Sequence, residues 1–217
     1  MLSLAEEDYI KAIYHLSRNN EEALTNAIAE KLQTKPASVT DMLKRLAEKG
    51  ILNYLKYRGV TLTDKGRSIA LQLVRKHRLW EVFLVEKLRF SWDEVHEVAE
   101  QLEHIQSILL TQRLDEFLGF PKFDPHGDPI PNENGEFEVK PQIPLGQGAI
   151  GQTYTVIGVE NTNPAFLQYL NKIGVHIGAN IKILDKIDYD GSLELLIDQQ
   201  KTMLVSGEVA KNILTEK

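Results

Sequence analysis

The stretch 119–144 limits the folds open to this 217-residue chain more than any other segment. It contains six of the eight prolines and three glycines, so neither a helix nor a strand can run through it. Before it, apolar residues recur at helical spacing, and after it they alternate in short runs that are typical of strands. We therefore expect a multidomain, mainly α protein in which a loop joins a helical part to a small β domain.

The helical part itself divides into two blocks. The first predicts three short helices and then a hairpin that turns at Arg58-Gly59, with Thr25 and Thr34 capping the second and third helices and Gly50 ending the third. The second block predicts one long helix from about Asp64 and another from about Ser91 to about Leu118. The predicted domains are a helix-and-hairpin domain at 1–72, a helical domain at 73–125, a proline-rich linker at 126–143 and a β domain at 144–217. In the last, TYTVIGV, NIKILDKI, SLELLID and TMLVS are expected strands, PAFLQYLNKIG is an expected helix, and a further helix is expected near the end.

The composition restricts the chemistry of any metal site. Cysteine is absent, which excludes disulfides, iron–sulfur clusters and zinc–thiolate sites. Histidine nitrogen and carboxylate oxygen remain as ligands, and these suit manganese and ferrous iron. No apolar run reaches the roughly 20 residues of a membrane span, and MLSLAEEDY lacks the features of a secretory signal, so a cytoplasmic chain without membrane contact is expected.

Charge is distributed unevenly along the chain. The net charge is −6, but residues 35–67 contain eight Lys or Arg against three Asp or Glu, a local net charge of +5. After Arg78 the balance reverses, with 11 basic and 22 acidic residues. A local basic surface is what contact with nucleic-acid phosphates requires, whatever the total charge.

The basic segment covers the third predicted helix and the hairpin. Helices two and three fit a helix-turn-helix whose third helix enters the major groove of double-stranded DNA, and the hairpin fits a wing. Small residues at the start of that helix would let the backbone approach the bases, and basic or aromatic residues further along and in the wing would contact phosphates. A solvated basic face on a small helical domain is the structural alternative. The candidate DNA-binding residues are Lys35, Pro36, Ala37, Ser38, Thr40, Asp41, Lys44, Tyr57 and Arg58.

The second block contains a pattern typical of metal sites. His96, Glu100, Glu103 and His104 follow one another at helical spacing, so one face of the predicted helix would carry all four. His77 and Glu81 lie four residues apart on the preceding helix. Two antiparallel helices could bring these faces together around a divalent cation. The alternative is a solvated acidic face with incidental histidines, and spacing alone leaves both open.

At this point the chain resembles the diphtheria toxin repressor family, and within it the three-domain manganese-sensing branch. The resemblance covers nearly the whole chain and rests on EEDYIKAIYHL, LTDKGRSIALQLVRKHRLWEVFL, VHEVAEQLEHI and DPHGDPIP. The C-terminal block resembles the small SH3-like β-barrel of ferrous-transport accessory proteins, the FeoA-like fold. The resemblance therefore implies a winged helix-turn-helix, a helical dimerisation domain and a FeoA-like barrel.

The resemblance also implies two metal sites. The primary site would use Asp8, Glu100, Glu103 and His104, with Asp124 at a position where some relatives have a cysteine. The ancillary site would use His77, Glu81 and His96, and the barrel would add a ligand at Glu160 or Asn161.

Three positions depart from the family pattern. Lys11 replaces a glutamate that helps hold a pair of metal ions in two-domain manganese sensors, and a charged lysine cannot ligate. Asn161 stands where relatives have an acid, which puts the barrel ligand in doubt. Asp41 replaces a glutamine that reads DNA in iron sensors, so the operator sequence of those proteins does not transfer.

The function that the resemblance implies is transcriptional regulation, with no enzymatic activity. The chain would repress metal-uptake genes by binding operator DNA as a homodimer when loaded with Mn²⁺ or Fe²⁺. Asp8 and Glu100 replace the sulfur ligands of iron sensors, which favours manganese. One alternative is a winged-helix regulator that senses a non-metal ligand or a protein partner. A metal-dependent hydrolase is another, although HExxH and nucleophile-elbow motifs are both absent.

Overall fold

The computed structural model describes residues 2–17, 22–55 and 59–217, and it divides into two compact units. The first unit comprises Met1–His77, Glu100–Ile108 and Pro131–Glu136, and the second comprises Arg78–Ala99, Leu109–Ile130 and Phe137–Lys217. The expected multidomain, mainly α fold with a C-terminal β domain is confirmed.

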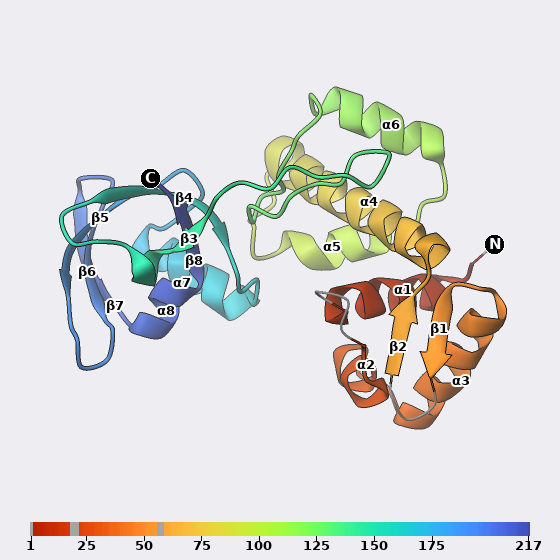
Figure 1. Ribbon diagram of the computed structural model, residues 1–217. Coiled ribbons are helices and arrows are strands. Elements are labelled where there is room, and N and C mark those ends of the chain that lie inside the picture. The colour runs from red at the N-terminus through yellow and green to blue at the C-terminus, as the bar shows by residue number, and fades with distance from the viewer. Residues whose placement is uncertain (1, 18–21, 56–58) are drawn as a thin grey trace. The chain divides into compact units, whose positions relative to one another are not determined.

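The first unit contains a bundle of three short helices with a two-stranded hairpin (Figure 1). The two strands pair antiparallel, with Asn53 opposite Thr61. The apolar positions face inward, as their spacing predicts, and Ile10, Leu43 and Leu46 are fully buried. The elements are α1 (Leu4–Leu16), α2 (Thr25–Lys31), α3 (Pro36–Glu48), β1 (Leu52–Leu55) and β2 (Gly59–Leu62).

The starts of α2 and α3 differ from the prediction. Leu24 and Lys35 are the N-cap residues and neither helix has a side-chain cap, so the two predicted threonine caps are wrong. Pro36 occupies the first turn of α3, where its missing N–H costs nothing and its fixed φ suits the helix. Gly50 follows the helix with a φ of 66°, the left-handed conformation that ends helices, as predicted.

The helical region after the hairpin also differs from the prediction. The helix α4 (Asp64–Leu88) starts where expected and contributes to both units. The segment predicted as one further helix is instead α5 (Val95–Leu102) and α6 (Ile108–Phe117). The helix α5 ends at Leu102, and the side chains of Glu103 and His104 in the turn after it contact residues of α1. The expected single helical face with four ligands is therefore wrong.

The β domain lies in the second unit and is a six-stranded antiparallel sheet with the strand order β3-β8-β4-β5-β6-β7. The four predicted strands and both predicted helices are present, whereas β3 and β8 were not predicted. Trp92, from the turn before α5, belongs to the hydrophobic core of this domain. The elements are β3 (Ile143–Pro144), β4 (Thr153–Val159), α7 (Pro164–Ile173), β5 (Asn180–Lys186), β6 (Leu193–Ile197), β7 (Lys201–Val205), α8 (Gly207–Lys211) and β8 (Ile213–Glu216).

The proline-rich segment contains no helix, as expected. Two arginines of α4 donate hydrogen bonds to its backbone carbonyls. In the first unit, the buried Arg75 guanidinium donates to the carbonyl of Pro131 at 2.8 Å. In the second unit, Arg78 donates to the carbonyl of Pro129. Proline-rich chain has few N–H donors of its own, so its carbonyls take donors from side chains instead.

Candidate metal centres and nucleic-acid interface

A first cluster of metal-ligating side chains lies in the first unit, where α1 meets the turn after α5. Ligand atoms of Asp8, Glu103 and His104 all lie within 4.8 Å of one another. The Nε2 atom of His104 is 3.1 Å from Oδ1 of Asp8, and Glu103 is fully buried. Two carboxylates and one imidazole are a donor set that suits Mn²⁺ or Fe²⁺. The cluster brings together three of the four residues expected for the primary site.

Glu7 orients the imidazole of this cluster. Its Oε2 lies 2.7 Å from His104 Nδ1, and its Oε1 accepts a hydrogen bond from Gln106 at 2.7 Å. A carboxylate can only accept, so Nδ1 donates to Glu7, and Nε2, which faces Asp8, is the nitrogen that would ligate a cation. Sequence reasoning missed Glu7. The sequence did contain a signal for it, because Glu7 is an acidic residue on the buried face of an amphipathic helix and directly precedes the expected ligand Asp8.

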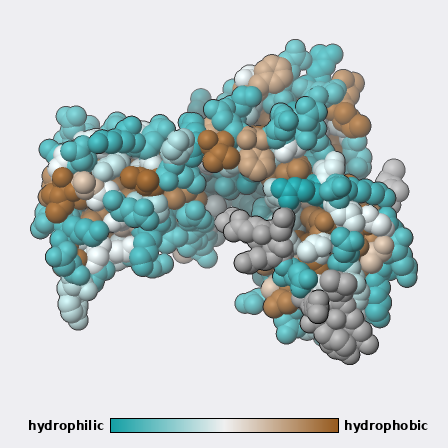
Figure 2. Space-filling view, viewed as in Figure 1, coloured by the Kyte–Doolittle hydropathy of each residue, from teal (hydrophilic) through white to brown (hydrophobic). Residues whose placement is uncertain are grey.

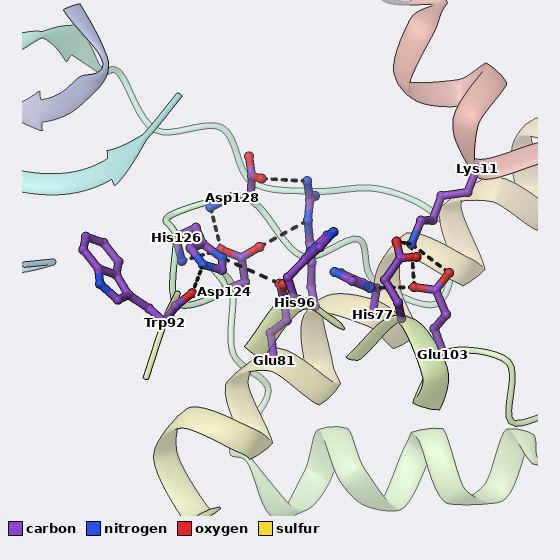
Figure 3. A network of polar contacts seen from close by, with 11 residues as sticks. Lys11, His77, Glu81, Trp92, His96, Glu103, Asp124, His126 and Asp128 are labelled. Atoms are coloured by element: carbon purple, nitrogen blue, oxygen red, sulfur yellow. Dashed lines mark hydrogen bonds and ion pairs between the residues drawn. The ribbon is translucent and has the colours of Figure 1, made fainter. Parts of the chain in front are cut away.

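Lys11 supplies a positive charge at the same place (Figure 3). Its Nζ atom lies 2.7 Å from Glu100 Oε1 and 2.6 Å from Glu103 Oε2. His77 Nδ1 also lies 2.5 Å from Glu103 Oε2. Glu100, the fourth expected primary ligand, is therefore bound to lysine in this structure.

The electrostatics of the cluster oppose charge on Asp8. Burial raises the pKa of its carboxyl most, His104 lowers it, the nearby Glu100 and Glu103 raise it, and Lys11 lowers it, with a net upward shift. The part of this shift that comes from Glu100 and Glu103 is repulsion between carboxylates, which a bound cation would relieve.

A second cluster lies in the second unit and contains Glu81, Asp124 and His126, all buried, with ligand atoms within 4.8 Å of one another. His126 Nε2 is 2.7 Å from the carbonyl oxygen of Trp92, and the imidazole stacks on the Trp92 ring. A carbonyl can only accept, so Nε2 carries the proton and Nδ1 faces Glu81 Oε2 at 3.8 Å, available to a metal ion. Figure 3 shows these side chains converging.

The loop of this second cluster is rigidly placed. Oδ1 of Asp124 accepts from the backbone N–H groups of His126 and Asp128 at 2.8 and 2.9 Å, and Arg78 lies 3.4 Å from Oδ2. Gly127 has a φ of 89°, and a Cβ there would lie 2.1 Å from the carbonyl oxygen of Ile157 in β4, so only glycine fits. The β domain thus holds the loop that carries two of the three candidate ligands.

The surroundings of this cluster favour bound protons, since the pKa values of Asp124 and His126 are both raised. Burial, with the charges of Glu81 and Asp128, raises the pKa of Asp124 to about 7. Burial by itself would lower the pKa of His126, but the hydrogen bond and charge of Glu81 outweigh it and raise the pKa to about 9. A cavity of about 440 Å³ borders the cluster at Asp124 and is also lined by Phe123 and Trp92.

One expected ligand groups differently from the prediction. Asp124 was expected at the primary site, and the structure groups it with Glu81 and His126. His126 itself was missed, although the DPH sequence places it two residues after an expected ligand.

The ancillary set remains a prediction. His96 Nδ1 lies 3.3 Å from Glu81 Oε1 in the second unit, and His77 belongs to the first unit. In the β domain, Asn161 Oδ1 accepts from the backbone of Asn163, and none of the metal-capable groups among the described residues includes Glu160.

The start of α3 presents the predicted DNA-binding face. Val39, Met42, Leu43 and Leu46 are buried against the domain core, which turns the opposite face outward. Thr40 is half-buried and donates to the carbonyl of Pro36 at 3.1 Å. Tyr57 and Arg58, expected at the wing tip, lie outside the described residues. The other candidates are all exposed: Lys35, Pro36, Ala37, Ser38, Asp41 and Lys44.

Comparisons with known proteins agree with these features. The model described as "Iron dependent repressor, N-terminal DNA binding domain" matches residues 1–60, the one described as "Iron dependent repressor, metal binding and dimerisation domain" matches 63–132, and the FeoA domain model matches 143–217. None of the described helices is both long and apolar enough to cross a membrane.

Individual relatives match over different lengths. The iron-dependent repressor IdeR of Mycobacterium tuberculosis is 37% identical over 125 residues, 58% of this chain and 54% of that protein, so the chain spans about half the length of the IdeR proteins that it matches. The regulator MntR of Oceanobacillus iheyensis is 38% identical over 118 residues, 54% of this chain and 80% of that protein.

A solved structure matches over nearly its full length. The structure titled "Manganese-dependent transcriptional repressor complex with manganese" is 35% identical, has a TM-score of 0.86 and covers 97% of this chain and 99% of its own. Relatives of this length and identity, together with three domain models matched in order, show that the chain belongs to the diphtheria toxin repressor family of metal-dependent transcriptional repressors, which are not enzymes.

Proposed function

We propose that this protein is a metal-dependent transcriptional repressor that binds double-stranded operator DNA as a homodimer when loaded with Mn²⁺ or Fe²⁺. The observation that carries the proposal is the cluster of Asp8, Glu103 and His104. Asp8 lies on α1 of the DNA-binding domain, and the other two follow α5.

The residues of the first cluster have the chemistry for such a switch. When bound, a divalent cation supplies the positive charge that lets the two carboxylates approach each other. Glu7 holds the imidazole of His104 with Nε2 directed at Asp8, so the donor set is arranged in advance. Ligands from two domains convert cation binding into a preference for one arrangement of the DNA-reading helices.

The donor set favours manganese. The donor set contains only oxygen and nitrogen atoms. Relatives of this chain include one repressor titled as manganese-dependent and another titled as iron-dependent. Another solved relative is titled as ScaR with bound Zn²⁺, which fits the limited selectivity of such ligands.

Dimerisation is expected to use the helical domain. Hydrophobic atoms gather on the surface over the start of α6 (Figure 2), where Leu109 is 63% exposed, and Phe117 at its end is equally exposed. Large exposed apolar residues that gather on one helix are typical of interaction sites. A dimer would place two recognition helices for two half-sites about one turn of DNA apart.

The compartment that we propose is the cytoplasm, where operator DNA is found.

The first test is operator binding with and without Mn²⁺. Genomic fragments selected by the manganese-loaded protein serve as operator, and affinity is measured by fluorescence anisotropy at fixed salt. We expect Mn²⁺ to strengthen binding by roughly 5–150-fold, the range of ordinary allosteric coupling, and expect Asp8→Ala and Glu103→Ala each to abolish that gain. The exposed carboxylate variant Asp188→Ala should behave as wild type.

Equal affinity in Mn²⁺ and in chelator would contradict the proposal and favour a regulator that senses a non-metal ligand or a protein partner. Asp8 is partly exposed, so its variant tests the site even if the buried Glu103 variant unfolds.

A further inference from the structure

A cavity of about 440 Å³ lies in the second unit and takes no part in the proposed function. Its volume falls within the range of about 300–1,000 Å³ that is usual for small-molecule sites. Its walls come from the end of α4, the turn before α5, the loop after α6, and the end of α7 with the chain that follows. Of the described residues of the second cluster, Asp124 alone lines it.

Three aromatic side chains line the cavity: Phe90, Trp92 and Phe123. Trp92 is 8% exposed, and its Nε1 donates to Oδ1 of Asn171 at 2.8 Å. Indole has no other polar atom, so the ring can offer a ligand only its π surface. Such surfaces pack against other rings and attract positive charge.

One of these rings already binds a cation of the chain. The ammonium of Lys140 lies 4.5 Å from the centre of the Phe123 ring, inside the range of about 6 Å over which a ring face attracts a cation. Lys140 itself does not line the cavity. The Phe123 ring thus lies where an ammonium group can settle against it.

The charges of the cavity wall also favour a cation. The wall contains the carboxylates of Glu86 and Asp124, whereas none of the described residues that line it is a lysine or an arginine. Asp124 is already bound by Arg78 and by two backbone N–H groups. The side chain of Glu86 is 53% exposed and pairs with Lys87 at 3.2 Å, a surface ion pair that contributes little. Glu86 is therefore the carboxylate that can exchange its partner for the charge of a ligand.

These features together select one class of ligand. An anion would meet two carboxylates and no permanently charged cation in the described part of the wall. A purely apolar molecule would remove water from Glu86 without giving it a partner, which costs free energy. An amine that carries an aromatic ring offers a surface to the three rings and a charge to Glu86.

We propose that this cavity binds small aromatic amines. The ring of the ligand packs among Phe90, Trp92 and Phe123, and its ammonium group pairs with Glu86. The site would give the regulator an organic ligand in addition to its metal ion, and it touches the metal centres only at Asp124.

The test compares three probes that share one ring. The full-length protein is titrated by calorimetry with 2-phenylethylamine, with the neutral 2-phenylethanol and with the anionic phenylacetate. We expect the amine to bind roughly 3–30-fold more tightly than the alcohol, the range that a cation over an aromatic ring contributes as water is excluded. Phenylacetate should bind most weakly.

Trp92 reports directly from the cavity. The chain has two tryptophans, so Trp80→Phe leaves Trp92 as the only indole. We expect its fluorescence to follow a saturation curve with the same dissociation constant as calorimetry gives for the amine.

Two pairs of variants separate the charge from the rings. Glu86→Gln removes the charge at nearly constant size, and it should remove most of the amine's advantage while 2-phenylethanol binds as before. Phe123→Leu should weaken the binding of both. The matched controls Glu116→Gln and Phe137→Leu change exposed residues that do not line the cavity, and both should behave as wild type.

Three results would overturn the inference. One is the absence of saturable 2-phenylethylamine binding up to about 10 mM, the weakest affinity expected for a specific ligand of this size. Another is equal affinity for the amine and the alcohol, which would show that the cavity does not select a cation. The third is a Glu86→Gln protein, folded by circular dichroism, that keeps the full preference for the amine. None of these results depends on Mn²⁺, so the proposed function stands or fails separately.

Discussion

At the scale of single residues, the two clusters depend on histidines whose second nitrogen is fixed by a partner. Glu7 fixes His104, and the carbonyl of Trp92 fixes His126. In both cases the nitrogen left to ligate faces a carboxylate, Asp8 or Glu81. Such outer partners set the orientation of metal ligands and contribute to affinity.

Glu7 gives a direct test of this role. We expect Glu7→Gln to weaken Mn²⁺ binding at the first cluster by roughly 10–100-fold, because an amide holds the imidazole less firmly than a carboxylate does. The measurement is chelator competition, together with the ¹⁵N chemical shifts of the His104 ring, which report which nitrogen carries the proton.

Glu6→Gln is the matched control, since Glu6 is equally buried on α1 but pairs with Lys49. Unchanged ring shifts and unchanged affinity in Glu7→Gln would show that Glu7 does not orient His104.

The second cluster predicts a dependence on pH. Both pKa values, about 7 for Asp124 and about 9 for His126, lie above the ordinary values of these groups, so the metal-free fold binds more protons than the unfolded chain. Its free energy of unfolding should therefore fall as pH rises through this range: the contribution of His126 is complete below its ordinary pKa of 6.5 and is lost through about 9. Metal must displace the same protons, so Mn²⁺ affinity should rise with pH.

Melting temperature in chelator and Mn²⁺ affinity, both measured as functions of pH, check these trends. His126→Gln should flatten both, whereas the exposed imidazole variant His176→Gln should change neither. Curves for His126→Gln that follow wild type would refute the assignment.

At the scale of elements, the main departure from the sequence prediction is the end of α5. Helical spacing from His96 to His104 predicted one continuous face, but the last two ligands lie in a turn. Periodicity reports local preference only, and here the partners of Glu103 and His104 come from α1, about ninety residues away in the chain. The two predicted threonine caps failed for another local reason. Residue preferences at a helix start are weak, and the first residue of a helix is hard to place from sequence.

The helix α6 carries the prediction at this scale. We expect Leu109→Glu to shift the protein from dimer to monomer in size-exclusion chromatography with light scattering, because a charge would be buried without a partner in the dimer interface. The corresponding change on an exposed residue of the β domain, Leu204→Glu, should leave the dimer intact. A Leu109→Glu protein that remains dimeric would place the interface elsewhere.

At the scale of the whole molecule, the β domain has a structural role that its sequence did not reveal. The backbone N–H of Val159 in β4 donates to the carbonyl of His126 at 3.0 Å, and Trp92 lies in the domain core while its carbonyl meets the same imidazole. The sheet therefore supports the second cluster through the backbone, without contributing a side chain to its ligand set.

The sequence by itself determined the order of the helical and β parts, the exposed face of α3, and the restriction of any metal ligands to nitrogen and oxygen donors. These follow from local periodicity, from the proline-rich break and from the absence of cysteine, which need no knowledge of contacts. The tertiary structure alone decided which side chains meet: Asp124 with His126 and Glu81, Lys11 with Glu100 and Glu103, and Glu7 with His104. Such groupings join residues far apart in the chain, and they depend on packing and burial that no local pattern encodes.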